Sequence, residues 1–255
     1  MTFQGLSQLL PVSLPALARI GGIVACAPPF AGAVVPRRVR VMIAIALTIG
    51  LSPAAGASKL PDGILACVFA LAGEAVIGVA IGLSLSFLFL AAQWTGEIIT
   101  TQLGLNLGES FDPNFEGGGA SLSQAYWLLT AIVFFAINGH QALVRGIQSS
   151  FQILPPLHAL DSGTILDMLV KLLGSATSLA VRLAAPVFIT MFIVDLAIGM
   201  VGRTMEQVGL MTVGITLRSI AGLIVLVLGM ALATTLLQGA AVGWFSAIQS
   251  ALSGR

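Results

Sequence analysis

Residues 64–92 read ILACVFALAGEAVIGVAIGLSLSFLFLAA, and Glu74 is the only charged residue among them. About 20 apolar residues in a helix cross the hydrocarbon layer of a membrane, where a helix satisfies its own backbone hydrogen bonds. The stretch is longer than one straight span needs. It therefore predicts a membrane-associated helix that is steeply tilted, folded into a hairpin or extended beyond the lipid.

The rest of the chain repeats this apolar composition in long segments. Six such segments are expected, at residues 9–35, 41–56, 64–92, 126–143, 166–202 and 213–243. Prolines between and within them, including Pro186, should break or kink the helices because proline removes a backbone donor and crowds the preceding turn. The sequence thus predicts an all-α, polytopic protein built from membrane-associated helical hairpins.

Composition excludes several classes of protein. Of the 255 residues, 57% are hydrophobic and only 8% are charged, whereas about 25% are charged in soluble proteins. With a mean hydropathy of +1.04, the chain cannot cover a water-soluble globule with polar groups. The net charge of +1 offers no basic face for a nucleic acid. The sequence contains no GxxxxGK[ST], HExxH, GxSxG or CxxC motif, so we expect no enzymatic activity, cofactor or metal.

The densest group of positive charge predicts the orientation of the chain in the membrane. Arg37, Arg38 and Arg40 lie between the first two apolar segments. Short loops rich in lysine and arginine stay on the cytoplasmic side. This basic loop is therefore expected to be cytoplasmic.

Small residues recur at a spacing of four, which places them on one face of a helix. One stripe begins with Glu74 and continues through Gly78, Gly82 and Ser86; the other consists of Gly96, Thr100, Gly104 and Gly108. Small side chains let helix backbones approach closely in membrane proteins. The number of such faces favours packing against other subunits.

A polar segment follows the second stripe, at about residues 105–121. It combines acidic residues, aromatic residues, a proline and three consecutive glycines, and its candidate functional residues are Glu109, Phe111, Asp112, Pro113, Phe115, Gly117, Gly118 and Gly119. Proline and glycine oppose a helix, while two phenylalanines favour burial. The composition is typical of a lid or plug with two apolar anchors, and the alternative is a solvated loop between helices.

Several ionisable residues lie within or at the ends of the apolar segments, where each should have a partner or face water. They are Arg19, Glu74, Arg182, Asp195 and Arg218, with Arg203 at a segment end. The candidates for buried charges are Arg182, Asp195, Arg203 and Arg218. A pair of Asp195 with Arg218 or Arg182 would stabilise a hairpin of the last two segments. The alternative is that these charges line a polar conduit or a proton path.

The chain resembles the FliR family of flagellar export-gate proteins, which includes the corresponding component of virulence type III secretion systems. The resemblance covers nearly the whole chain and rests on the order and spacing of short motifs. They are Ala27-Pro28-Pro29-Phe30, Val35-Pro36-Arg37-Arg38-Val39-Arg40, Gly96-Glu97-Ile98-Ile99, Gln102-Leu103-Gly104, Phe111-Asp112-Pro113, Asn138-Gly139-His140 and Asp195-Leu196-Ala197-Ile198-Gly199 with Arg203.

The resemblance implies a non-enzymatic subunit, residues 1–255 forming a single domain, in the flagellar basal body of the bacterial inner membrane. The implied partners are subunits of the FliP and FliQ families, proteins of the FlhB and FlhA families, exported unfolded proteins and membrane lipid. In that family the loop after the Gly96-type helix helps to close the pore, so the segment around Phe111-Asp112-Pro113 would be the plug.

The sequence departs from the family pattern at Met205-Glu206-Gln207, at Thr216 and at Gly117-Gly118-Gly119. The first two departures affect the geometry after Arg203, and the third suggests a more flexible plug. Two other functions stay open at this point. One is the equivalent subunit of a virulence secretion system, and the other is a small-solute secondary transporter that uses Glu74, Asp195 and Arg218.

Overall fold

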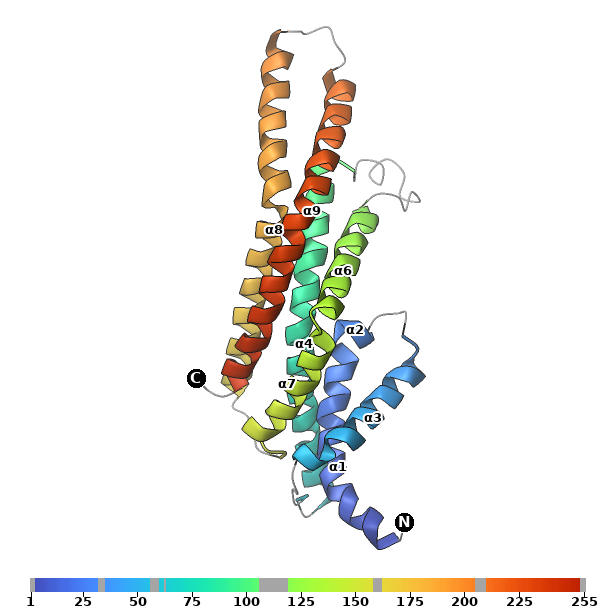
Figure 1. Ribbon diagram of the computed structural model, residues 1–255. Coiled ribbons are helices and arrows are strands. Elements are labelled where there is room, and N and C mark those ends of the chain that lie inside the picture. The colour runs from blue at the N-terminus through green and yellow to red at the C-terminus, as the bar shows by residue number, and fades with distance from the viewer. Residues whose placement is uncertain are drawn as a thin grey trace. The chain divides into compact units, whose positions relative to one another are not determined.

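The computed structural model describes the backbone of residues 3–31, 35–55, 60–61, 63–105, 119–157, 162–204 and 210–252 (Figure 1). These residues are helical apart from short turns and connections, and they contain no strand. The helices are α1 (Phe3–Cys26), α2 (Pro28–Ala31), α3 (Arg37–Ala55), α4 (Ile64–Leu103), α6 (Gly119–Ala136), α7 (Gly139–Ile153), α8 (Ser162–Thr204) and α9 (Leu210–Leu252). The all-α prediction is confirmed for this part of the chain.

The helices that can cross a membrane are fewer than the predicted apolar segments. Within the described ranges, three are long and apolar enough, namely α4, Ile165–Met200 of α8 and Thr216–Ile248 of α9. A fourth span results if Leu122–Ala136 and Gly139–Ile153 are taken together, with a bend of 70° at their junction. At 40 residues, α4 is about 60 Å long, which exceeds the roughly 30 Å of hydrocarbon.

Helix boundaries differ from the predicted segments where backbone conformation decides them. The first segment is interrupted at Ala27, before Pro28. The fourth is interrupted at Asn138, whose φ of 58° is left-handed, a conformation that asparagine adopts more readily than most residues. Pro186, in contrast, lies inside α8 without ending it, so of the two expected effects, a break or a kink, the break does not occur here.

The chain groups into two compact units, which we describe separately. Unit 1 comprises residues 1–88, 138–174 and 241–255, and unit 2 comprises residues 89–137 and 175–240.

In unit 1, α1 packs closely against α4 through the first stripe of small residues. A Cβ atom at Gly78 would collide with the carbonyl oxygen of Arg19, and one at Gly82 would lie 2.8 Å from the carbonyl oxygen of Ile23. The facing position on α1 is equally tight, because a Cβ at Gly22 would lie 2.6 Å from the carbonyl oxygen of Ala75. This stripe therefore packs within the chain, and it gives no argument for contact with another subunit.

Unit 2 is built around the carboxyl-terminal part of α4. The ring of Phe89 lies 5.9 Å from that of Trp127 and 5.9 Å from that of Phe134, both in α6. A Cβ at Gly96 would lie 2.5 Å from Cα of Ser123. The second stripe of small residues thus also faces a helix of the same chain at this position.

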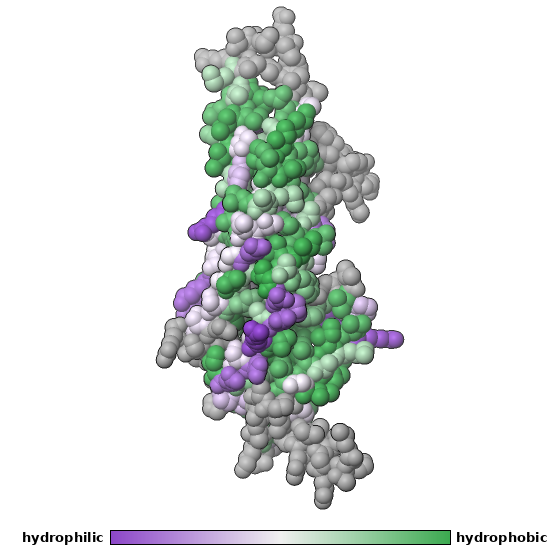
Figure 2. All heavy atoms as spheres, in the orientation of Figure 1, coloured by the Kyte–Doolittle hydropathy of each residue, from purple (hydrophilic) through white to green (hydrophobic). Residues whose placement is uncertain are grey.

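Large apolar side chains remain exposed on the surface of α8 and α9 in unit 2. They include Phe188, Ile189, Phe192, Ile193, Leu196, Leu223, Ile224, Val227 and Leu228. Figure 2 shows apolar residues gathered over these two helices. A surface of this composition is unfavourable in water and requires lipid or other protein as its surroundings.

Candidate functional site

The carboxyl-terminal end of α4 is closed by a specific backbone motif. Gly104 has a φ of 71°, which glycine adopts without steric penalty. Its N–H donates to the carbonyl of Thr101 at 3.1 Å, and the N–H of Leu105 donates to the carbonyl of Thr100 at 3.2 Å. This pair of bonds is the Schellman motif, which leaves the last carbonyls of the helix in need of other donors.

Arg218 and Ser219 of α9 supply those donors. Nε of Arg218 donates to the carbonyl of Gln102 at 2.5 Å, and Nη2 reaches Oε1 of the same glutamine at 3.3 Å. The hydroxyl of Ser219 donates to the carbonyl of Leu103 at 3.4 Å. A guanidinium at this end of a helix also interacts favourably with the helix dipole.

Asp195 of α8 balances the charge of Arg218. Its Oδ1 lies 3.3 Å from Nη1 of Arg218, and the two side chains are 45% and 30% exposed. We call Gln102, Asp195, Arg218 and Ser219 the Arg218 cluster. It joins three helices of unit 2 at the point where α4 ends, and it includes one of the two pairings expected for Asp195.

The description of these residues as buried charges does not fit the single chain. Arg182 is exposed on α8, and Asp195 and Arg218 are partly exposed. They lie on apolar helices, but on faces that the chain itself leaves uncovered. Arg203 belongs to α8, and its side chain is outside the described set.

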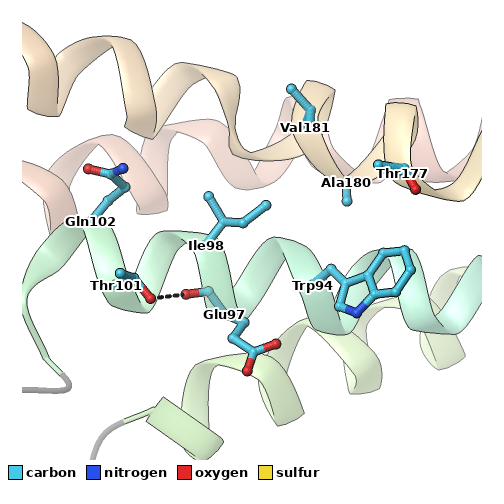
Figure 3. A pocket seen from close by; sticks show the side chains of 8 residues that line it. All are labelled: Trp94, Glu97, Ile98, Thr101, Gln102, Thr177, Ala180 and Val181. Carbon is cyan, nitrogen blue, oxygen red and sulfur yellow. Dashed lines mark hydrogen bonds between the residues drawn. The ribbon is translucent and has the colours of Figure 1, made fainter.

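An open groove of about 530 Å³ lies beside the Arg218 cluster, between α4 and α8 (Figure 3). It is lined by Trp94, Glu97, Ile98, Thr101 and Gln102 of α4 and by Thr177, Ala180 and Val181 of α8. The hydroxyl of Thr95 approaches the carbonyl of Ala180 at 3.4 Å, so the two helices touch at the base of the groove. Gln102 belongs both to the groove and to the Arg218 cluster.

Unit 1 contains a second polar cluster, whose two charged residues were each expected to need a partner but were not paired from the sequence. Arg19 and Glu74 form an ion pair of 2.6 Å with side chains that are 0% and 1% exposed. Two lone opposite charges in apolar segments, each in need of a partner, are the signal that could have revealed this pair. Their separation of 55 positions in the chain left no local pattern that joins them.

The backbone of α7 and the turn after it complete this cluster. Nη1 of Arg19 donates to the carbonyls of Ser150 at 3.1 Å and Leu154 at 3.0 Å. Oε1 of Glu74 accepts from the N–H of Leu157 at 2.7 Å. The guanidinium also lies 4.7 Å from the ring centre of Phe151, within the range of a cation–π contact. We call Arg19, Glu74 and Phe151 with these backbone groups the Arg19 cluster.

The remaining predicted site residues fall into two groups. Arg37, Arg38 and Arg40 form the first turn of α3 and not a loop, and Arg40 donates to the carbonyl of Ala31 at 3.0 Å. The side of the membrane that they occupy stays a prediction. Residues outside the described ranges are Gly108 and the predicted plug residues Glu109, Phe111, Asp112, Pro113, Phe115, Gly117 and Gly118, while Gly119 begins α6.

Comparison with known proteins gives a consistent result over most of the chain. The family model described as "Bacterial export proteins, family 1" matches residues 10–242. The flagellar biosynthetic protein FliR of Caulobacter vibrioides is 28% identical over 215 residues, which cover 84% of this chain and 86% of that protein. FliR of Escherichia coli is 28% identical over 209 residues, covering 81% and 79%. FliR of Aquifex aeolicus is 28% identical over 217 residues, covering 81% and 80%.

Proposed function

We propose, because this chain belongs to the bacterial export proteins of family 1, that it is a non-enzymatic subunit of the flagellar type III protein export gate. The observation that carries the proposal is the family match, which spans both compact units and all helices from α1 to α9. The three relatives described above are all flagellar biosynthetic proteins. This favours the flagellar system over a virulence secretion system.

The surface of the chain supports a role inside a larger membrane assembly. Exposed apolar side chains cover α8 and α9, and a single small subunit leaves them without a partner. We propose that subunits of the FliP and FliQ families cover part of this surface in the basal body of the inner membrane. Proteins of the FlhB and FlhA families would be further neighbours, and unfolded flagellar proteins would be the substrates.

The segment that follows α4 would act as the plug of this gate. Support comes from its composition and from the family resemblance of Phe111-Asp112-Pro113. Phe111 and Phe115 would seat the plug in apolar surroundings, and the acidic residues would keep it soluble when it is displaced. The Arg218 cluster is suited to hold the end of α4 from which this segment departs.

Deletion of the gene in a flagellated host tests the function. We expect loss of filaments, of export of filament protein and of swimming, with recovery when the full chain is supplied on a plasmid. The detergent-solubilised chain should bring subunits of the FliP and FliQ families with it. Normal motility of the deletion strain, or a solitary monodisperse protein after extraction, would contradict the proposal.

A separate measurement tests the plug. Removal of residues 109–119 from the assembled gate should make the membrane leak small ions while the subunits still purify together. The matched control is a chain in which the segment is replaced by a polar linker of the same length that lacks the two phenylalanines. Unchanged conductance in both variants would count against the plug and leave the export function standing.

A further inference from the structure

The groove between α4 and α8 combines apolar walls with one carboxylate. Ile98 and Val181 contribute apolar side chains from opposite sides, and Trp94 contributes its indole ring. Figure 3 shows the carboxylate of Glu97 at the edge of the groove, directed away from α8. Ala180 is small and buried at the base of the groove, where Thr95 of α4 already contacts its carbonyl.

Within the part of the chain that the structure describes, the carboxylate of Glu97 differs from those of the two clusters in having no ion-pair or hydrogen-bond partner. Glu97 is exposed, and among the described side chains none forms an ion pair or hydrogen bond with its carboxylate. The bond drawn from Thr101 in Figure 3 ends on the backbone carbonyl of Glu97. Glu74 and Asp195, in comparison, are each paired with an arginine.

The charge restricts what can occupy this groove. An apolar helix or lipid chain that covers both the groove and its edge would remove water from Glu97. An ionised carboxylate that loses water without a counter-charge is strongly destabilised. A basic side chain restores the balance, and the ring of Trp94 offers a cation a second favourable contact. We infer that the groove docks a helix of a neighbouring membrane subunit that brings a lysine or arginine to Glu97. The inference rests on the proposed function, because the assembled gate supplies that subunit.

The continuity of the groove with the Arg218 cluster supports a protein occupant over a lipid. Gln102 lines the groove and also accepts a hydrogen bond from Arg218, and Thr177 lies on the opposite wall. Amide and hydroxyl groups next to small residues are typical of interfaces between membrane helices. An acyl chain cannot form hydrogen bonds with these polar groups.

Charge reversal at Glu97 tests the inference in the complete assembly. The full chain is expressed together with the other gate subunits and purified through a tag on this chain. Glu97→Lys should lower recovery of the neighbouring subunit by about tenfold or more, because like charges meet across the interface. Glu97→Gln should have a smaller effect. The matched control is Asp167→Lys, which reverses the same charge at an exposed position of α8 outside the groove.

Identification of the partner residue completes the test. A photo-crosslinking phenylalanine at position 181 should attach to a subunit helix that carries a lysine or arginine, and changing that residue to Glu should restore recovery with Glu97→Lys. Normal recovery with Glu97→Lys, crosslinks to lipid alone, or no restoration would overturn the inference while the proposed function stands. If the wild-type chain recovers no subunit, the proposed function fails and the inference fails with it.

Discussion

The Arg19 cluster and the Arg218 cluster each contain one arginine and one carboxylate, yet they differ in almost every physical property. The pair in unit 1 is 2.6 Å long, with side chains that are 0% and 1% exposed. The pair in unit 2 is 3.3 Å long, with side chains that are 30% and 45% exposed. Water and salt can therefore replace one partner in unit 2 and cannot do so in unit 1.

The difference in exposure and distance indicates which contact contributes most to stability in each cluster. In unit 1 both partners are needed, because either one alone would be an uncompensated buried charge. In unit 2 the contact of Arg218 with the carbonyl of Gln102 is shorter than its contact with Asp195. The arginine there acts mainly on the end of α4, and Asp195 serves as a counter-ion.

The largest effect should follow from breaking the buried pair. Glu74→Leu leaves Arg19 without a counter-ion and should destabilise the protein by about 3–5 kcal/mol. The measurement is the free energy of unfolding of the detergent-solubilised chain, followed by fluorescence of Trp244. This indole reports on unit 1 because its Nε1 donates to the carbonyl of Ser84 at 2.6 Å.

The double variant Arg19→Met with Glu74→Leu is the control for this prediction. It removes both charges and keeps similar volume, so it should recover much of the lost stability. Equal losses in the single and double variants would show that packing, and not the unpaired charge, dominates the Arg19 cluster.

The next effect concerns the close approach of α1 and α4 that brings the buried pair together. Gly78→Ala should destabilise unit 1 by about 1–3 kcal/mol, because the new methyl group meets the backbone of Arg19 and the helices must separate. Gly73→Ala is the matched control, since nothing lies within 4 Å of its added methyl group. It should be neutral or stabilising by up to about 1 kcal/mol through helix propensity. Equal effects of the two substitutions would contradict the close packing.

The sequence predicted the features that depend on local pattern. The apolar composition of residues 64–92, 166–202 and 213–243 located α4, α8 and α9, and the regular spacing of Gly78 and Gly82 indicated a packing face. Pattern alone could not identify which helix covers that face. The partner is α1 of the same chain, whereas the sequence favoured another subunit.

Features that depend on distant residues were predicted less well. Asp195 and Arg218 lie on consecutive apolar segments. A hairpin of these two segments brings the two residues close together, so their pairing could be predicted. Arg19 and Glu74 have no such relation, and only the packing of α1 on α4 brings them together. The break between α6 and α7 depends on the left-handed backbone conformation of the single residue Asn138. The spacing of apolar residues along the sequence contains no information about that conformation.

A moderate effect should follow from removing the arginine of the exposed pair. Arg218→Leu leaves the carbonyl of Gln102 without its donor and removes a favourable charge from the helix end, with an expected loss of about 1–2 kcal/mol. Arg218→Lys should recover only part of it, because an ammonium cannot hold two acceptors in the planar geometry of a guanidinium. Hydrogen exchange at the amides of Gly104 and Leu105 measures this effect locally, because both close the end of α4. Unchanged protection in Arg218→Leu would be inconsistent with this role.

The smallest effect should come from Asp195→Asn, and its size tests the whole contrast between the clusters. The amide oxygen can still accept a hydrogen bond from Arg218, so only the charge is lost, and a partly exposed pair contributes about 0–1 kcal/mol. The measurement is again the free energy of unfolding. Its difference between Asp195→Asn and wild type should decrease further between low salt and about 0.5 M salt, because salt screens the charges. The loss of unfolding free energy caused by Glu74→Gln in the buried pair, measured in the same way, should be several times larger and should not depend on salt. If Asp195→Asn destabilises the assembled gate as much as Glu74→Gln does, while its effect on the isolated chain stays small, then a neighbouring subunit covers the Arg218 cluster and turns the exposed pair into a buried one.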